Sequence, residues 1–187
     1  SVHMDEPVEK VMKLGQLYYD IRDGLSAAKT PEEYGAFPYD PYSHTPAHSG
    51  AQQPGMTGQV KEEIMTRFGE LGCQVVESCL RFEPFLLKRN EFLNEKRVFN
   101  YYDVFNQEQR LTIQKGQLAY TFCQVPIVYT LSNNKNLIIL DFNDGSMIEL
   151  EGNRLDNKHS SYIFERNNKI IKISVSIYNK SLFDYDK

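Results

Sequence analysis

The spacing of apolar residues divides the chain into a helical first part and a strand-rich second part. Apolar positions recur at helical spacing over residues 5–29 and again over 58–71, and Gly72 suits a left-handed cap after the second helix. From Cys73 onward, apolar and polar positions alternate with period two, which is typical of β-strands. The pattern therefore predicts two helices followed by a β domain.

The alternating part predicts a series of short strands, at 74–82, 97–105, 109–114, 117–123, 126–131, 136–142, 145–151, 160–166 and 169–177. The segments 143–146 and 167–168 have the composition of hairpin turns. Pro126 indicates an edge strand or a bulge, because proline cannot donate to a sheet ladder. Many short strands at this spacing indicate an antiparallel β-sandwich of about 8–9 strands.

The predicted fold class is α+β, with two N-terminal helices joined by a long ordered loop and followed by the sandwich. Residues 1–4 resemble the remnant of an expression tag. Residues 5–72 then form a helix–loop–helix unit and residues 73–187 form the β-sandwich domain.

Composition and charge exclude some classes of partner. The chain has 187 residues, a formal net charge of -4 and no dense Lys/Arg cluster, so the electrostatic signature of a nucleic-acid binder is missing. No apolar run approaches the roughly 20 residues that a membrane-spanning helix needs. Three cysteines at irregular spacing indicate buried or half-buried thiols. In one extended strand, Cys73 and Cys79 would lie roughly 20 Å apart, too far for a disulfide.

Residues 30–57 form the least regular segment, rich in Pro, Gly and aromatic residues. A loop of this length is usually disordered or functional, and its many aromatic residues favour an ordered loop. A sugar site needs rings that stack on apolar C–H faces, together with planar polar groups that donate and accept hydrogen bonds. The loop supplies candidates for both roles: Tyr39, Tyr42, His44, Gln52 and Gln53 for binding, with Asp40 as an acid. The alternative is a packed loop whose rings fill a hydrophobic gap and whose Asp40 stabilises a turn.

Glu63 is the second candidate acid. On a helical wheel it borders the apolar stripe of 58–71, whereas Glu62 points the opposite way. Asp40 and Glu63 could form the pair of carboxylates that glycoside hydrolysis requires.

Other chemistry is less well supported by the pattern. Asp40, His44 and His48 recur at four-residue intervals, but Pro41 and Pro46 interrupt any helix that would bring them together, so no metal is predicted. No cofactor is predicted, because no P-loop, dinucleotide fingerprint or nucleophile elbow is present.

The aromatic and acidic residues of the second half have simple interpretations. Ordinary packing explains the alternating rings, with a binding platform as the alternative; they are Tyr101, Tyr102, Tyr120, Phe122 and Tyr129. Solvated faces and turns explain the acidic residues Asp141, Asp144, Glu149 and Glu151.

Several segments together resemble a known family. KTPEEYGAFPYDPYSHTP and GAQQPGMTGQVKEEI, with FEPFLL and GQLAYTFCQVP further on, resemble the C-terminal region of bacterial six-hairpin glycoside-hydrolase-like proteins. The resemblance implies an (α/α)6 toroid that encloses a sugar site and is followed by a small β-sandwich. Residues 5–29 and 58–71 would then be the last helices of the toroid, and 30–57 would lie over its mouth. A complete toroid needs many more helices than the two predicted here.

The sequence therefore predicts the C-terminal fragment of a carbohydrate-active, glycoside-hydrolase-like protein, inactive alone. Its partners would be a carbohydrate and the remainder of a larger polypeptide, with Glu63 and Asp40 as candidate catalytic residues. The alternatives are a self-standing carbohydrate-binding or protein-interaction module without catalysis, and a purely structural domain. A periplasmic or extracellular location would require a signal peptide on the parent protein.

Overall fold

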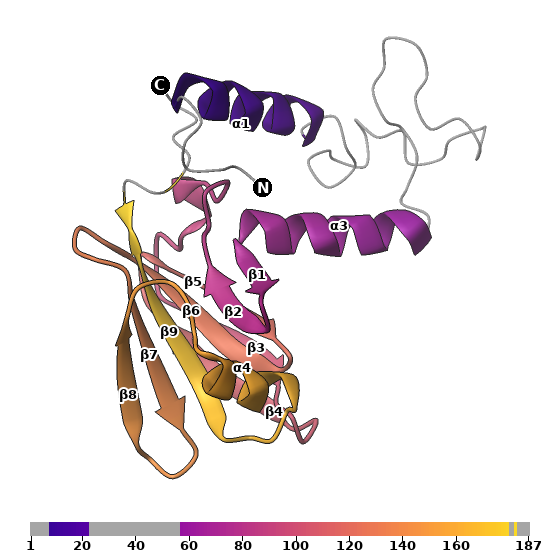
Figure 1. Cartoon of the computed structure of the whole chain (residues 1–187). Coiled ribbons are helices and arrows are strands. Elements are labelled where there is room, and N and C mark those ends of the chain that lie inside the picture. Colours follow the sequence, from indigo (N-terminus) through magenta and orange to yellow (C-terminus); the bar gives the residue numbers. More distant parts are fainter. Residues whose placement is uncertain (1–7, 23–56, 180–181, 183–187) are drawn as a thin grey trace. The chain divides into compact units, whose positions relative to one another are not determined.

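The structure of the chain, a computed structural model, describes residues 8–22, 57–179 and 182 (Figure 1). The chain divides into two compact units, Ser1–Arg67 and Phe68–Lys187. Helix α1 (Val8–Arg22) and most of helix α3 (Thr57–Glu70) belong to the first unit. These helices confirm the two predicted over 5–29 and 58–71, as far as the described residues extend. The loop predicted to join them lies outside those residues.

The second unit consists mainly of strands. In chain order its elements are β1 (Cys73–Val76), β2 (Cys79–Phe82), the short 3-10 helix η2 (Arg89–Glu91), β3 (Arg97–Tyr102), β4 (Glu108–Ile113), β5 (Gln117–Phe122), β6 (Val125–Ser132), β7 (Leu137–Phe142), β8 (Met147–Glu151), α4 (Asn157–Phe164) and β9 (Ile170–Tyr178). The α+β class is therefore confirmed.

The strands do not form the single antiparallel sandwich of about 8–9 strands that the pattern predicts. They form two separate two-stranded sheets, β1–β2 and β3–β4, and one five-stranded sheet in the order β5-β6-β9-β7-β8. The physical reason is the connection before β9. Helix α4 lets the chain return across the sheet, so β9 enters between β6 and β7 and runs parallel to β6.

Two predicted strands are wrong in detail. The segment 74–82 is a hairpin whose turn residues Glu77 and Ser78 have positive φ angles of 51° and 61°. Because the hairpin folds back, the extended-strand distance between Cys73 and Cys79 does not apply; both thiols are buried and free. The segment 160–166 belongs largely to helix α4. Its N-cap is Asp156, whose side chain accepts a hydrogen bond from His159 N.

Pro126 occupies an inner strand and no bulge, which differs from the prediction of an edge or bulge. It is the second residue of β6, where pairing with β9 begins one residue later at Ile127. The missing N–H of proline therefore disrupts no bond to β9. The turn predicted at 143–146 is confirmed between β7 and β8, with Gly145 at φ 84°.

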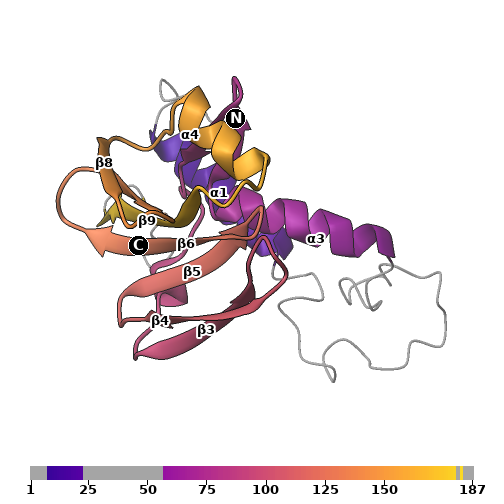
Figure 2. The same cartoon turned by 90° about the horizontal axis from the view of Figure 1, so that it is seen from below.

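One face of the five-stranded sheet is the core of the second unit. Alternate residues of β5, β6, β7 and β9 point to this core face and are buried: Leu118, Ile127, Tyr129, Ile138, Leu140, Ile173, Val175 and Ile177. Hairpin β1–β2 and helix α4 pack on the same core through Leu80, Phe82 and Ile163. Figure 2 shows hairpin β3–β4 beside β5, away from α4.

The other face of the sheet, here called the second face, is more polar. Strand register places its residues in rows that cross the sheet. One row contains Met147, Asp141 and Lys172; the next contains Glu149, Ile139, Ser174, Val128 and Ala119; a third contains Glu151, Leu137, Ser176, Thr130 and Gln117. This face positions the candidate site.

Candidate functional site

The residues predicted from the sequence to form a sugar site are not described by the structure. Asp40, Tyr39, Tyr42, His44, Gln52 and Gln53 lie outside the described residues. Glu63 lies within α3, but its side chain is also outside the described part. The roles proposed for these seven residues therefore stay predictions.

A cleft in the second unit gathers the chemistry that the loop was expected to supply. It has a volume of about 430 Å³ and lies between the β3–β4 hairpin and the sheet, with the β5–β6 turn and the start of β9 at its ends. Its polar lining comes from four parts of the chain and consists of Asp103, Gln109, Gln124, Asp141, Asn168 and Lys172. We call it the hairpin cleft. Its size falls within the range of roughly 300–1,000 Å³ that is usual for small-molecule sites.

Asp103 organises the turn of the hairpin at one end of the cleft. Its Oδ1 accepts hydrogen bonds from Phe105 N at 2.9 Å and from Gln107 N at 3.0 Å. Its Oδ2 accepts from Gln109 Nε2 at 2.8 Å, and its backbone oxygen accepts from Gln124 Nε2 at 2.7 Å. Both glutamines use their Nε2 donors in these bonds, which leaves their amide oxygens available as acceptors for a ligand.

These hydrogen bonds also fix the charge of Asp103. The bond from the Gln107 backbone, followed by those from Gln109 and Phe105, lowers the pKa of the Asp103 carboxyl below its ordinary value. The group is therefore an ionised acceptor near neutral pH and holds no proton for general acid catalysis.

Two rings supply apolar surface in the same cleft. Tyr101 is half-buried and stacks on Phe99, with ring centroids 5.8 Å apart and an interplanar angle of 15°. Burial raises the pKa of the Tyr101 hydroxyl, so it remains a neutral donor. Phe105 lines the cleft with 64% of its surface exposed. One ring is thus stacked on its neighbour, while the other is mostly exposed.

Asp141 and Lys172 lie on the sheet side of the cleft and form an ion pair with each other. They are register partners on β7 and β9, and both side chains are about two-thirds or more buried. This position corrects the prediction that Asp141 belongs to a solvated face. With Asp103, the cleft carries two negative charges and one positive charge, so an anionic ligand would meet a net negative lining.

A second polar cluster lies in the core, where it has a structural role. Tyr120 Oη donates to Tyr129 Oη at 2.8 Å, and Tyr129 Oη donates to the Leu71 carbonyl at 2.7 Å. Cys73 lies against Tyr120, and burial raises the pKa of its thiol to about 12. A thiol with this pKa is neutral and a poor nucleophile.

Metal binding finds no support within the described part of the chain. No group of three or more His, Cys, Asp or Glu side chains gathers there in a way that could hold an ion. His44 and His48 of the predicted loop are not among these residues.

No family model matches the chain, and no curated protein matches it. Among the described helices, none is long and apolar enough to cross a membrane. The class that can be stated is therefore an α+β protein whose strand-rich unit carries a polar, ring-lined cleft.

The sequence pattern missed most of this cleft. Packing is the preferred explanation for the alternating rings that include Tyr101, and the pattern gives no role to Asp103, Gln109 or Gln124. Asn168 falls in the hairpin turn predicted at 167–168, but this prediction is wrong, because the segment joins helix α4 to β9. The available signal was the Asp-Val-Phe-Asn-Gln run at 103–107, which has turn composition and a ring at its centre.

Proposed function

We propose that the chain is the C-terminal part of a carbohydrate-active protein and that its strand-rich unit binds a saccharide in the hairpin cleft. The observation that carries this proposal is the combination of rings, amide oxygens and carboxylates in one cleft of about 430 Å³. Rings can stack on the apolar face of a sugar, while amides and carboxylates accept hydrogen bonds from its hydroxyls. The resemblance of other segments to six-hairpin glycoside-hydrolase-like proteins supports the same class of ligand.

The charges of the cleft favour a neutral saccharide. Lys172 is already paired with Asp141, and Asp103 remains ionised, so no unpaired cation offers a site for a carboxylate or sulfate group within the cleft lining. The ionised Asp103 also favours binding over hydrolysis, because bond cleavage between sugars needs a protonated acid beside the leaving oxygen.

The test is saccharide binding by the whole chain, with variants in neighbouring tyrosines. Tyr101 lines the cleft, whereas its neighbour Tyr102 lies on the outer face of the hairpin with 58% of its surface exposed. We expect Tyr101→Ala to weaken binding about tenfold or more, equivalent to about 1.4 kcal/mol, while Tyr102→Ala leaves it unchanged. A glycan array identifies the ligand and titration calorimetry measures the affinities.

A supporting variant avoids any loss of hairpin packing. Phe105 is mostly exposed, so Phe105→Ala removes a stacking surface with little effect on stability. Two results would refute the cleft as the binding site. One is an equal loss of affinity in the Tyr101 and Tyr102 variants, and the other is full affinity in both the Tyr101 and Phe105 variants.

Hydrolysis by the parent protein is the second candidate, and the resemblance of the 29–64 segment is the observation that favours it. We expect Glu63→Gln and Asp40→Asn to lower turnover of a glycan panel by the full-length parent at least about a hundredfold, since each would remove a catalytic acid or base. Undiminished turnover in both variants would exclude these carboxylates. Tyr39→Ala and Tyr42→Ala test the loop rings in the same assay.

A further inference from the structure

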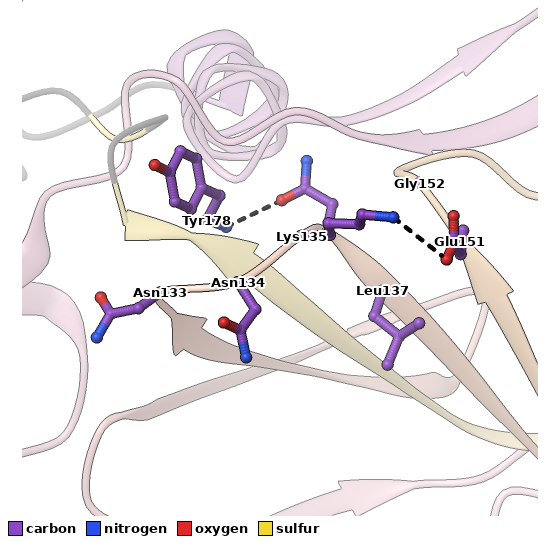
Figure 3. Close-up of a pocket in the computed structure, with 8 residues that line it drawn as sticks. Asn133, Asn134, Lys135, Leu137, Glu151, Gly152 and Tyr178 are labelled. Carbon is purple, nitrogen blue, oxygen red and sulfur yellow. Dashed lines mark hydrogen bonds and ion pairs between the residues drawn. The ribbon is translucent and has the colours of Figure 1, made fainter.

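A second hollow lies on the same face of the sheet as the hairpin cleft, at the other end of the strands. It is lined by Leu137 and Glu151 of the third row, by Tyr178 at the end of β9 and by asparagines of the β6–β7 connection (Figure 3). Tyr178 lies six positions after the cleft residue Lys172 on β9. We call this surface the far hollow.

The lining of the far hollow also suits a neutral, hydroxyl-rich ligand. Asn133, Asn134 and Asn136 contribute amide groups, and Tyr178 and Leu137 contribute apolar surface. Asn136 Oδ1 accepts a hydrogen bond from Tyr178 N at 2.9 Å, which fixes the connection against the strand. The charged pair at its rim, Lys135 and Glu151, is solvent-exposed and adds no net charge.

The surface between the two hollows is lined by small polar side chains along β9. Ser174 and Ser176 are half-buried and present hydroxyl groups, and Thr130 lies beside Ser176 on β6. At about 3.3 Å per residue, the six steps from Lys172 to Tyr178 span roughly 20 Å. Ser174 lies in one row with Ile139 of β7 and with Val128 of β6, which is buried, so the stretch from the hairpin cleft to the far hollow runs along β9.

We infer that the second face binds a linear, neutral glycan of several units, which occupies the hairpin cleft and the far hollow together. The inference rests on the proposed saccharide binding and adds the length of the ligand. A strand-like peptide is less suited to this stretch, because β9 and β7 are inner strands whose backbone groups already pair on both sides. Sugars instead need side-chain hydroxyls, amides and rings, which both hollows offer.

The test is the dependence of affinity on ligand length for the whole chain. Titration calorimetry with cello-, xylo- and malto-oligosaccharides, each from the disaccharide to the hexasaccharide, compares ligands that fill one hollow with ligands that reach both. We expect the best series to gain about tenfold or more in affinity between its shortest and longest members, because the second contact becomes intramolecular.

A bulky substitution on β9 between the two hollows makes the test specific, because it would obstruct a ligand that spans them. Ser174→Ile adds a bulky side chain that strands tolerate well, and Thr112→Ile places the same side chain on the exposed outer face of β4, with a smaller gain in size. We expect Ser174→Ile to abolish the gain with length and to leave disaccharide affinity unchanged, while Thr112→Ile retains the gain. Ser176→Ile is the second blocking variant, and thermal unfolding checks that each variant is folded.

The outcomes separate this inference from the proposed function. If disaccharide binding depends on Tyr101 but affinity does not increase with ligand length, the inference of an extended ligand is refuted. The proposal that the hairpin cleft binds a saccharide is then retained. Full length dependence in both Ser174→Ile and Ser176→Ile would also overturn it. If no saccharide of any length binds, both the proposed function and this inference fail.

Discussion

Gly72 lets two backbone segments of the strand-rich unit approach each other closely. It has a φ angle of 62°, donates to Gly69 O at 3.1 Å and accepts from Glu83 N at 2.8 Å. A Cβ atom at this position would lie 2.0 Å from the carbonyl carbon of Glu83. Both the left-handed conformation and the close approach of two backbone segments therefore require glycine.

This requirement gives a prediction about stability with a matched control. Gly72→Ala should lower the free energy of unfolding by more than about 3 kcal/mol, because the strain of a left-handed alanine adds to a clash with backbone that cannot move aside. Gly116→Ala places the same side chain at φ 79° with no atom within 4 Å, so it should cost only about 1 kcal/mol. Urea denaturation measures both, and equal costs would contradict the close-approach argument.

At the scale of elements, strands β1, β5 and β6 each contribute one buried titratable group to the core. Cys73 comes from β1, Tyr120 from β5 and Tyr129 from β6, and burial raises the pKa of all three. A group whose pKa is raised on folding contributes stability below its unfolded pKa, and this contribution is lost as the pH rises through the folded pKa. For Cys73 the loss begins near 9.0 and ends near 12.

We therefore expect the free energy of unfolding to fall steadily above about pH 9, in a reducing buffer that keeps the thiols free. Cys73→Ala should flatten the first part of this decline, where the tyrosines are still protonated in the unfolded chain. Urea denaturation at a series of pH values gives the slope. A stability that stays constant from pH 9 to 12 would show that these groups are not shielded from solvent in the folded protein.

Strands with one buried face give the clearest signal in the sequence. Strands 117–123, 136–142 and 169–177 alternate clearly because one of their faces is buried, and they correspond to β5, β7 and β9. The hairpin within 74–82 was missed because Glu77 and Ser78 take left-handed conformations that usually mark Asn or Gly. The short run 160–166 fits both the helical period and the strand period. Asp156, which caps helix α4, is the signal in the sequence that favours a helix.

At the scale of the whole molecule, the hairpin cleft could not be predicted from spacing in the sequence. Its lining comes from the β3–β4 turn, the β5–β6 turn, the end of β7 and the start of β9, which the sheet order brings together. Local patterns determine which residues form strands, but the placement of β9 between β6 and β7 depends on long-range pairing. The acidic residue Asp141 illustrates this, since its partner Lys172 lies 31 positions away.

The central place of β9 has a consequence for synthesis of the protein. The hairpins β5–β6 and β7–β8 leave the ribosome before β9, yet each has an edge that only β9 pairs. Until this strand emerges, both edges are open to wrong partners, including other nascent chains. The sheet therefore closes in one late step, and a chain terminated before Ile170 would leave two unjoined hairpins for chaperones and proteases to recognise.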